Sequence, residues 1–415
     1  MKRLMTLAAV LATTLGLFAG AGAVSVASAQ DATPVTDLPD GATVVASGLT
    51  SPRGFTWAED GTLYVALAGS GGANPATEEA PTTQAIGPWQ GGPTAAVARI
   101  ENGCPVAVAT GLPSAEAAIG DILGADDVAM LGGDLYAAVD GGGAVHGNPD
   151  QPSGVYRVSE DGGGGVEVVA DLSAWVRANP VAEIPGDHDP DSGAYRLVAD
   201  EGAGLLWAVD PNNGQILTIA PDGTITRVAD LSAEHPVPSA IALAPNGGVF
   251  VGNLTALPYT DGTAKVIHVA PDGTVTDVWT GLTAVTDVAV SPDGTLYASE
   301  LSTGNLQEAP FLVPGSGRVV RQTGPDTLEN VASGLMLPIA LDFSPDGDLY
   351  VALPALGADR GEGAIVRLDL MGVPGSPAAS GSDDTPACSP IPQTLESPHA
   401  EATPVAELDE HEAAA

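Results

Sequence analysis

The stretch Ser291-Pro-Asp-Gly-Thr-Leu-Tyr-Ala-Ser-Glu300 decides the fold of this chain. Its Asp-Gly pair lies between an apolar run, Val288–Val290, and an aromatic-centred run, Leu296–Ala298. Because Gly accepts a positive φ angle and Asp can close a turn with its own side chain, the stretch predicts a tight β-hairpin. Five similar hairpins are centred on the aromatic residues Tyr64, Tyr136, Trp207, Phe250 and Tyr350.

The six hairpins form a repeat. Their aromatic residues lie 72, 71, 43, 47 and 53 residues apart. Two further β-type runs follow each hairpin, for example Ala264–Val269 and Val275–Trp279 in the fourth copy. A repeat of roughly 40–50 residues with four short strands is typical of a β-propeller. We therefore predict an all-β fold, a six-bladed β-propeller of four-stranded antiparallel blades over residues 41–371, with NHL-like repeats.

The two ends of the repeat region predict how the ring closes. Residues 42–49 resemble a fourth strand, although they precede the first hairpin. The last repeat has a third strand, Ala364–Leu368, but no fourth strand of its own. We expect the N-terminal strand to complete the last blade, which would leave only short blade edges exposed.

Segments outside the repeats predict export. Residues 1–29 have the pattern of a Sec signal peptide, with Lys2-Arg3, an apolar run and an Ala27-Ser-Ala29 cleavage site. Cleavage after Ala29 predicts a secreted, periplasmic or cell-surface protein, and an uncleaved anchor is the alternative. Residues 30–40 are a spacer. Residues 372–415 are acidic and rich in Pro, Ala and Ser, which predicts a disordered tail.

The charge of the chain limits its partners. Asp and Glu number 52 against 13 Lys and Arg, a formal net charge of −39. This balance argues against binding of nucleic acid or insertion into an anionic membrane. We expect a monomer whose partner is a small molecule or a protein. The two cysteines, Cys104 and Cys388, can pair in an oxidising compartment, and the sequence leaves the pairing open.

Loop lengths predict a functional face. In an antiparallel blade, the loop between the second and third strands and the connection to the next blade lie on the same face. These are the long loops of the chain, and we call this side the long-loop face. The aromatic residues shared by the repeats could form a stacking ring for a ligand, but packing between adjacent blades is the favoured interpretation.

Polar residues at strand ends predict a candidate site at the channel mouth on this face. The candidate ligand-binding residues are Asp127, Asp210, Asn253, Asp287 and Glu300. Four of them, Asp210, Asn253, Asp287 and Glu300, could supply oxygen ligands to Ca²⁺ or another divalent cation. Such an ion could polarise a carbonyl group or activate water. The alternative is that these polar strand ends are simply hydrated in the channel.

A second acidic cluster lies in a long loop. Asp187, His188, Asp189 and Asp191 alternate in a way that could also bind a divalent metal ion. The spacing differs from that of an EF-hand, so a solvated acidic turn is the favoured interpretation. The chain contains no GxSxG, HExxH, Walker or CxxC motif, so the sequence identifies no catalytic residue.

Several stretches together resemble the ScyD/ScyE family of secreted propellers, which is named after scytonemin biosynthesis. They are Val45–Gly54 followed by Asp60–Ala66, Asp187–Tyr195, Gly252–Tyr259 and Asp287–Leu301. The first long loop departs from the family pattern, with Trp89 where cysteines are expected, and Asn253 replaces an expected Glu. The resemblance implies export and a propeller fold rather than a particular reaction.

Function stays open between three possibilities at this point. The first is a non-catalytic propeller that binds a small molecule or protein on its long-loop face. The second is an enzyme or accessory factor in the maturation of a secondary metabolite, which the resemblance implies. The third is a metal-dependent hydrolase or lactonase with its site at the channel mouth, by analogy with other six-bladed propellers.

Overall fold

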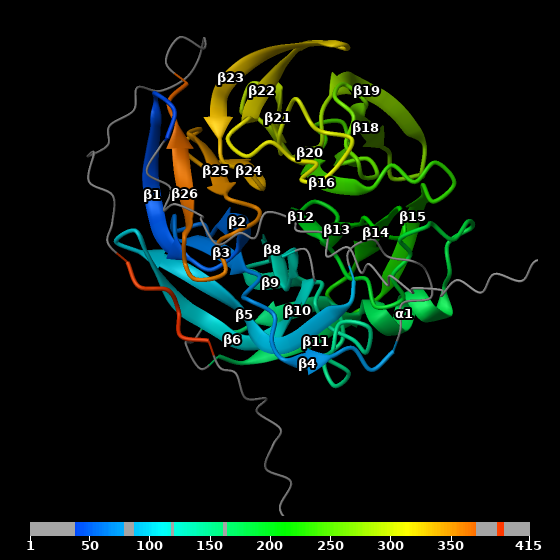
Figure 1. Ribbon diagram of the computed structural model, residues 1–415. Coiled ribbons are helices and arrows are strands. Elements are labelled where there is room, and N and C mark those ends of the chain that lie inside the picture. Colours follow the sequence, from blue (N-terminus) through cyan, green and yellow to red (C-terminus); the bar gives the residue numbers. More distant parts are fainter. Residues whose placement is uncertain (1–37, 79–86, 118–119, 161–163, 371–387, 394–415) are drawn as a thin grey trace, which may run out of the picture.

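A computed structural model of the protein describes residues 38–78, 87–117, 120–160, 164–370 and 388–393. Six antiparallel sheets surround a central channel (Figure 1). This confirms the predicted six-bladed propeller. The predicted signal peptide, its cleavage site and most of the predicted tail lie outside the described residues. Within the described residues, no helix is both long and apolar enough to cross a membrane.

Each of the first five blades is built from strands that follow one another in sequence. The first blade contains β2 (Pro52–Trp57), β3 (Leu63–Leu67), β5 (Trp89–Glu101) and β6 (Cys104–Ala117), with the short strands β4 (Asn74–Pro75) and β7 (Ile122–Leu123). The second contains β8 (Ala125–Leu131), β9 (Asp134–Val139), β10 (Gly154–Val158) and β11 (Val166–Asp171). The third contains β12 (Arg196–Asp200), β13 (Leu205–Asp210), β14 (Gln215–Ile219) and β15 (Ile225–Asp230).

The remaining blades follow the same plan. The fourth contains β16 (Pro238–Leu243), β17 (Val249–Asn253), β18 (Ala264–Val269) and β19 (Val275–Leu282). The fifth contains β20 (Val285–Val290), β21 (Leu296–Glu300), β22 (Gly317–Gly324) and β23 (Thr327–Leu335). The sixth contains β24 (Ala340–Phe343), β25 (Leu349–Leu353), β26 (Gly363–Leu368) and β1 (Ala42–Leu49).

The ring closes as the sequence predicts. Strand β1 pairs antiparallel with β26, from Ala42 opposite Leu368 to Leu49 opposite Gly363, and the two lie side by side in Figure 1. The inner strands are neighbours in the order β2, β8, β12, β16, β20, β24 and back to β2. The third and sixth blades are therefore opposite each other across the channel, as are the second and fifth.

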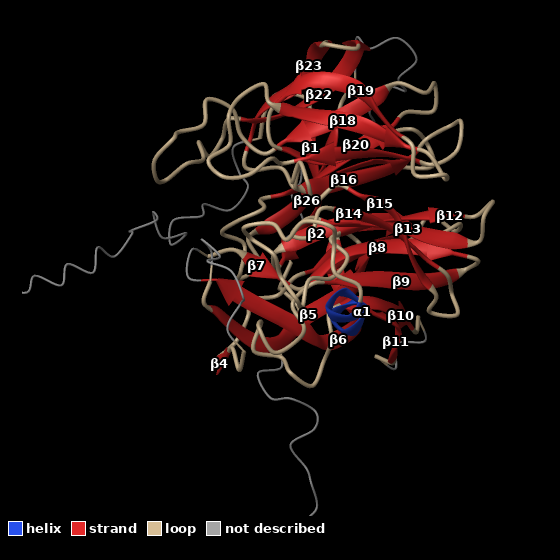
Figure 2. Cartoon of the chain, turned by 90° about the vertical axis from the view of Figure 1, so that its right-hand side faces the viewer, coloured by secondary structure: helices blue, strands red, loops and turns tan. Residues whose placement is uncertain are grey.

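The tight turns have the predicted chemistry. Gly294 has a φ angle of 87°, and Asp293 accepts a hydrogen bond from the Thr295 N–H at 3.1 Å. Asp60, Asp222 and Asp272 make the same contact in their own hairpins. The short turns and the longer loops project from opposite sides of the blades (Figure 2).

The shared aromatic residues pack between blades. Tyr136 of the second blade lies in a core cluster with Leu197 and Leu206 of the third, and Trp207 lies with Ile241 and Val249 of the fourth. The Tyr350 ring lies 5.2 Å from that of Trp57, which joins the last blade to the first. The aromatic positions therefore hold the blades together, as the packing interpretation expects.

Two features were not predicted. Helix α1 (Leu172–Ala178) follows β11, with Asp171 capping its first turn by accepting from the Ala174 N–H at 2.8 Å. Residues 388–393, within the predicted disordered tail, lie packed against the propeller, and Cys388 forms a disulfide with Cys104. The prediction of disorder is wrong for these six residues, because a covalent bond offsets their shortage of apolar side chains.

Candidate functional site

The inner strands begin at the long-loop face, and two arginines lie at the start of these strands. Arg196, the first residue of β12, is only 1% exposed. Its Nη1 donates to the Asp126 carbonyl at 2.7 Å, and its Nη2 donates to the Ile339 carbonyl at 2.6 Å. Since Ile339 precedes β24 in the opposite blade, the guanidinium group lies across the channel.

The second arginine joins the blades on either side of the ring closure. Arg53 of β2 is 2% exposed, and it donates to the carbonyls of Ala355 and Ile122 at 2.8 and 2.5 Å. Its Nε lies 3.4 Å from Asp126 Oδ1, in an ion pair whose two side chains are almost completely buried. Arg53 thus contacts the first, second and sixth blades. Burial raises the pKa of Asp126 to about 7, and the charge of Arg53 opposes this shift.

Two predicted site residues, Asp127 and Asp287, lie at matching positions in opposite blades. Asp127 accepts hydrogen bonds from the N–H groups of Val128 and Leu197, and Asp287 accepts from those of Val288 and Leu341. Each carboxylate therefore links its own inner strand to the next one. Burial raises the pKa of Asp127 to about 6 and that of Asp287 to about 8, and the nearby Arg196 opposes both shifts.

The other predicted channel-mouth residues make contacts within their own blades. Asp210 accepts hydrogen bonds from Ser192, Asn213 and Gln215. Asn253 contacts the Pro236 carbonyl and the Lys265 N–H. Glu300 accepts from the Thr283 N–H at 2.8 Å and forms an ion pair with Arg318.

The predicted calcium ligands therefore do not fit a shared ion. Asp210, Asn253, Asp287 and Glu300 each contact other residues rather than one another, and within the described ranges no group of three or more His, Cys, Asp or Glu side chains is placed to hold a metal ion. Arg196 also lies 3.7 Å from Asp287 and brings a positive charge to the place where the cation was expected. Like charges repel strongly in a buried setting, so the residues present favour ion pairs rather than a divalent ion.

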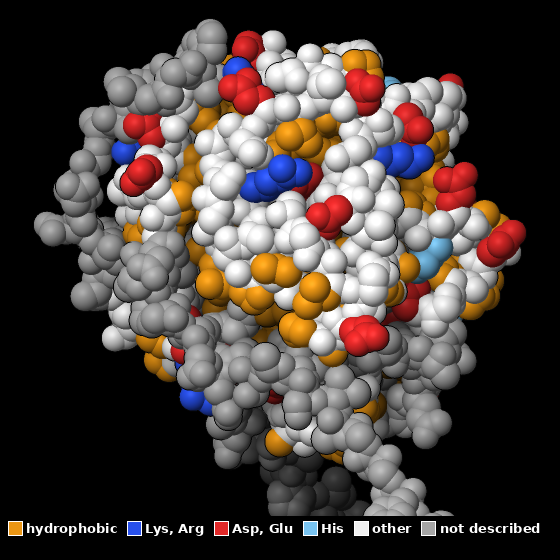
Figure 3. Space-filling view, turned by 45° about the horizontal axis from the view of Figure 1, so that its top comes forward, with side chains coloured by type: hydrophobic (Ala, Val, Ile, Leu, Met, Phe, Trp, Pro, Cys, Tyr) orange, Lys and Arg blue, Asp and Glu red, His pale blue; other side chains and the backbone are white. Residues whose placement is uncertain are grey.

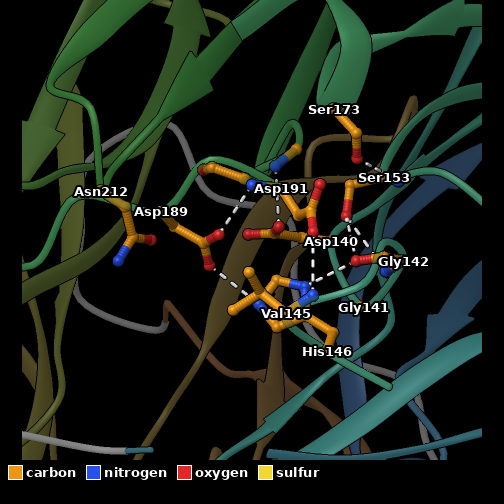
Figure 4. Close-up of polar contacts among 12 residues, drawn as sticks. Asp140, Gly141, Gly142, Val145, His146, Ser153, Ser173, Asp189, Asp191 and Asn212 are labelled. Carbon is orange, nitrogen blue, oxygen red and sulfur yellow. Dashed lines mark hydrogen bonds and ion pairs between the residues drawn. The ribbon is translucent and has the colours of Figure 1, made fainter. Parts of the chain in front are cut away.

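The acidic cluster predicted in the 183–194 loop forms a second polar group, drawn in Figure 4. We call it the loop cluster and define it as Asp140, His146, Arg177, Asp189 and Asp191. His146 Nε2 lies 2.8 Å from Asp189 Oδ2, and His146 Nδ1 lies 2.7 Å from the Gly142 carbonyl. Both ring nitrogens thus face oxygen acceptors, which favours the doubly protonated imidazolium.

The rest of the loop cluster is also paired. Asp191 accepts from the Val145 N–H at 2.9 Å and forms an ion pair with Arg177 at 2.9 Å. Asp140 accepts from the Gly193 N–H at 2.7 Å. Burial disfavours a charged His146, but the carboxylates of Asp189 and Asp140 outweigh burial and raise the pKa of His146 to about 9. The cluster therefore ties the 140–153 loop to the 183–194 loop.

The two remaining members of the predicted metal cluster point elsewhere. Asp187 Oδ1 lies 2.6 Å from His235 Nε2, and His188 Nδ1 contacts Asn213 Oδ1. The solvated-turn interpretation is wrong for Asp189 and Asp191, which are both 2% exposed. Asp187 and His188 keep more contact with solvent.

A third polar group lies where the channel meets the long-loop face. We call it the mouth cluster and define it as Arg53, Asp121, Asp126, Tyr195, Arg196 and Tyr259. The Arg196 guanidinium lies 4.9 Å from the centre of the Tyr195 ring. Burial raises the pKa of Tyr195, and the charges of Arg196 and Arg53 oppose that shift while those of Asp126 and Asp121 add to it. Burial, Asp121 and Tyr195 likewise raise the pKa of Tyr259.

Three members of the mouth cluster differ from the rest. Within the part of the chain that the structure describes, the hydroxyl groups of Tyr195 and Tyr259 make no hydrogen bond to another side chain, and the Asp121 carboxylate has only the backbone N–H of Ile122 as a hydrogen-bond partner. The two tyrosines, like Leu254 and Leu312, are partly buried side chains that pack against the core cluster around Leu49 and Leu67. Burial raises the pKa of Asp121, and the charge of Arg53 opposes the shift.

The channel continues beyond Arg196 as a cavity of about 350 Å³. All six inner strands line it, and its ionisable groups are Asp127, Asp287 and Asp342. Its volume lies within the range of small-molecule pockets. Burial raises the pKa of Asp342 to about 7, and Asp127 adds to this shift.

Sequence reasoning identified Asp127 and Asp287 but missed all six residues of the mouth cluster. A signal was present, since Arg53 and Arg196 are two of only 13 basic residues and both lie at the start of an apolar inner strand. Arg53, Tyr195 and Tyr259 also lie in stretches that carry the family resemblance. Their convergence depends on ring closure, which local patterns do not reveal.

Comparison with known proteins relates part of the chain to a described family. The family model of the SMP-30/Gluconolactonase/LRE-like region matches residues 197–370. This range begins in β12 and ends after β26, so it excludes Arg53, Asp121 and Asp126. No curated protein matches the chain.

Solved structures are similar to the chain in fold. A protein from Thermus thermophilus, named as a putative oxidoreductase (glucose dehydrogenase), has 16% identity and a TM-score of 0.51 over 79% of this chain and 99% of that one. A virginiamycin B lyase from Staphylococcus aureus has 14% identity and a TM-score of 0.41 over 79% of this chain and 97% of that one. At these identities the similarity supports a common fold only. It rests on the first structure, whose TM-score is 0.51.

Proposed function

We propose that this protein is a secreted, non-catalytic propeller that binds a small molecule at the mouth cluster. The observation that carries the proposal is the set formed by Asp121, Tyr195 and Tyr259, whose polar atoms make no hydrogen bond to another side chain within the described residues. All three residues are partly exposed, so their polar groups face the solvent at the channel mouth. Groups that lack a side-chain partner and face the solvent are available to a ligand.

The residues define the class of ligand. Two partly buried tyrosine rings, on the same apolar cluster as Leu254 and Leu312, suit a ring or another flat apolar body. The Asp121 carboxylate accepts hydrogen bonds, so it suits hydroxyl or amino donors. The net charge of −39 disfavours anions, and acidic side chains are spread over the surface seen in Figure 3. We therefore propose a neutral or cationic ring compound such as a phenol or a phenolic amine.

The resemblance to the ScyD/ScyE family is compatible with this ligand class. An accessory role in the maturation of a secondary metabolite would require a protein that holds a ring-containing compound outside the cytoplasm. Membership of that family and export are parts of the proposal. Mass spectrometry of the exported protein tests the second part, since cleavage after Ala29 leaves Gln30 as the first residue.

Lactone hydrolysis at the same mouth is the second candidate function. The family model named for gluconolactonase favours it through its match to residues 197–370. One observation opposes it: the described residues hold no group of three or more His, Cys, Asp or Glu side chains placed to bind a metal ion. We therefore rank it below ligand binding.

A panel of simple probes separates the two candidates. Tyramine and catechol are expected to raise the melting temperature of the mature protein, whereas benzoate is expected to leave it unchanged. Glucono-1,5-lactone with added Ca²⁺ should hydrolyse no faster than in protein-free buffer. Lactone turnover that a chelator abolishes would support hydrolysis instead, and the absence of stabilisation by every ring compound would contradict the binding proposal.

A further inference from the structure

Residues 388–393 lie across the junction between the last and first blades, and we call them the C-terminal strap. At one end, Cys388 is bonded to Cys104 of β6, with the two Cα atoms 5.3 Å apart. At the other end, Ser70 Oγ donates to Gln393 Oε1 at 2.6 Å. Both anchors belong to the first blade, and they lie 284 and 323 residues away in sequence.

The strap also contacts the sixth blade. Gly48 of β1 has a φ angle of 72°, and a Cβ atom there would lie 2.9 Å from Cys388 Cβ. A Cβ atom at Gly361 would likewise lie 2.8 Å from Pro390 Cβ. These close approaches require glycine on the sixth blade. The same blade meets the first blade where the Ser47 N–H donates to the Gly103 carbonyl at 3.1 Å, next to the disulfide.

Apolar packing fills the middle of the strap. Ile391 packs against the core cluster that contains Leu49 of β1, Leu67 of β3 and Ala355 of the sixth blade. A pocket of about 10 Å³ lies between Ile391–Gln393 and first-blade residues that include Leu67 and Thr94. The strap therefore fits its groove closely and contacts both sides of the junction.

We propose that the strap is a redox-controlled latch that fastens the ring at its closure. With the disulfide formed, the strap holds β1 and the 354–362 segment against the first blade. A dithiol reductant would convert Cys104 and Cys388 to two thiols and would itself be oxidised to a disulfide, with two electrons and two protons transferred. Both cysteines are only half-buried, so a reductant can reach them.

Reduction has a specific structural consequence. The strap would then be held by one side-chain hydrogen bond and by the packing of Ile391. These contacts are too few to offset the conformational entropy lost when six residues are ordered. The junction would keep the β1–β26 pairing but lose its outer fastening. Because the Ala355 carbonyl accepts from Arg53, the loosened segment is also the one that holds a mouth-cluster arginine.

Hydrogen exchange tests the latch without reference to any ligand. The mature wild-type protein is compared oxidised, reduced with dithiothreitol, and reoxidised. We expect at least tenfold faster amide exchange in residues 42–49, 354–362 and 388–393 on reduction, and recovery on reoxidation. Residues 238–253 of the fourth blade, far from the junction, serve as the internal control and should not change. The melting temperature should fall by roughly 5 °C.

Two variants separate the latch from general destabilisation. The double variant C104S/C388S should reproduce the reduced wild type and should no longer respond to dithiothreitol. Ile391→Ser, which keeps the disulfide, should speed exchange in the strap but leave 42–49 close to wild type. Unchanged exchange at 42–49 and 354–362 after reduction would overturn the proposal, and so would an equal increase around the whole ring. If the double variant does not fold, the reduced and reoxidised wild type still decides the matter.

Discussion

The loop cluster and the mouth cluster lie on the same face of the propeller and contain similar residues, yet they differ in how completely their polar groups are paired. In the loop cluster, His146 lies between Asp189 and the Gly142 carbonyl, and Asp191 is bonded to Arg177 and Val145. In the mouth cluster, the two arginines are paired, but Asp121 and two tyrosine hydroxyls make no side-chain hydrogen bond in the described chain.

This difference separates a structural cluster from a candidate binding site. An arrangement whose donors and acceptors are all satisfied adds rigidity and offers little to a ligand. An arrangement whose polar groups lack side-chain partners has capacity left for one. Acidic composition alone does not distinguish the two, which is why the sequence directed attention to Asp187–Asp191. The predictions below test the comparison by removing groups from each cluster.

The largest effect is expected from His146→Ala. The substitution removes the cation between buried carboxylates, and breaking a buried pair typically costs about 3–5 kcal/mol of unfolding free energy. Urea denaturation measures the loss. His268→Ala is the matched control. The contacts of His268 are an exposed hydrogen bond with the Gly247 carbonyl and a ring contact with Phe250, so the substitution should cost about 1 kcal/mol or less. Similar losses in the two variants would show that the loop cluster is not structural.

The pH dependence of stability is the next largest effect. Asp126 and Asp287 have pKa values of about 7 and 8 in the folded protein against an ordinary value of 3.8, so the folded state binds more protons between these limits. The pKa of His146 is also raised, from 6.5 to about 9, so this residue lowers stability as the pH rises between these two values. The melting temperature should therefore fall as pH rises from about 4 to about 9. Each additional bound proton lowers the unfolding free energy by about 1.4 kcal/mol per pH unit.

Asp189 affects the pH dependence of stability in the opposite direction. Burial alone would raise its pKa, but the charge of His146 and the hydrogen bond to it outweigh burial and lower the pKa. The stabilising effect of Asp189 is therefore lost as the solution becomes strongly acidic. Melting curves recorded across this range should thus show a maximum on the acidic side of neutrality. A maximum at alkaline pH would contradict the assigned shifts.

Asp287→Asn should flatten the central part of this profile. The amide cannot ionise, so the decline between about pH 4 and pH 8 should be smaller than in the wild type. Asp293→Asn, in an exposed hairpin turn, is the control and should leave the slope unchanged. Equal slopes in all three proteins would mean that Asp287 does not titrate in this range.

The smallest effect is expected from Asp187→Asn. Asp187 pairs with His235 at 2.6 Å, and its side chain is 38% exposed. Exposed pairs of this kind contribute between about 0 and 1 kcal/mol. The variant should therefore melt close to wild type and should bind ring compounds equally well, which makes it a useful control for the mouth cluster.

The parts of the structure that follow from local chemistry could be predicted from sequence. The Asp293-Gly294 turn is determined by residues within a few positions of each other, and the strand at 42–49 lacks a local partner, which predicts ring closure. The clusters depend on contacts between distant residues. Arg196 reaches the Ile339 carbonyl across 143 residues, and His146 meets Asp189 only after two loops pack together. Residue type and spacing do not contain that information.

The most direct test of the central claim compares calorimetric titrations of the wild type, Asp121→Asn and Asp187→Asn with the ring compound from the panel that binds most tightly. The two substitutions make the same chemical change on the same face, one in a group without a side-chain partner and one in an ion pair. We predict that Asp121→Asn weakens binding at least tenfold, or about 1.4 kcal/mol, with an unchanged melting temperature. Asp187→Asn should bind like the wild type. Equal affinity for all three proteins would contradict the assignment of the mouth cluster as the ligand site.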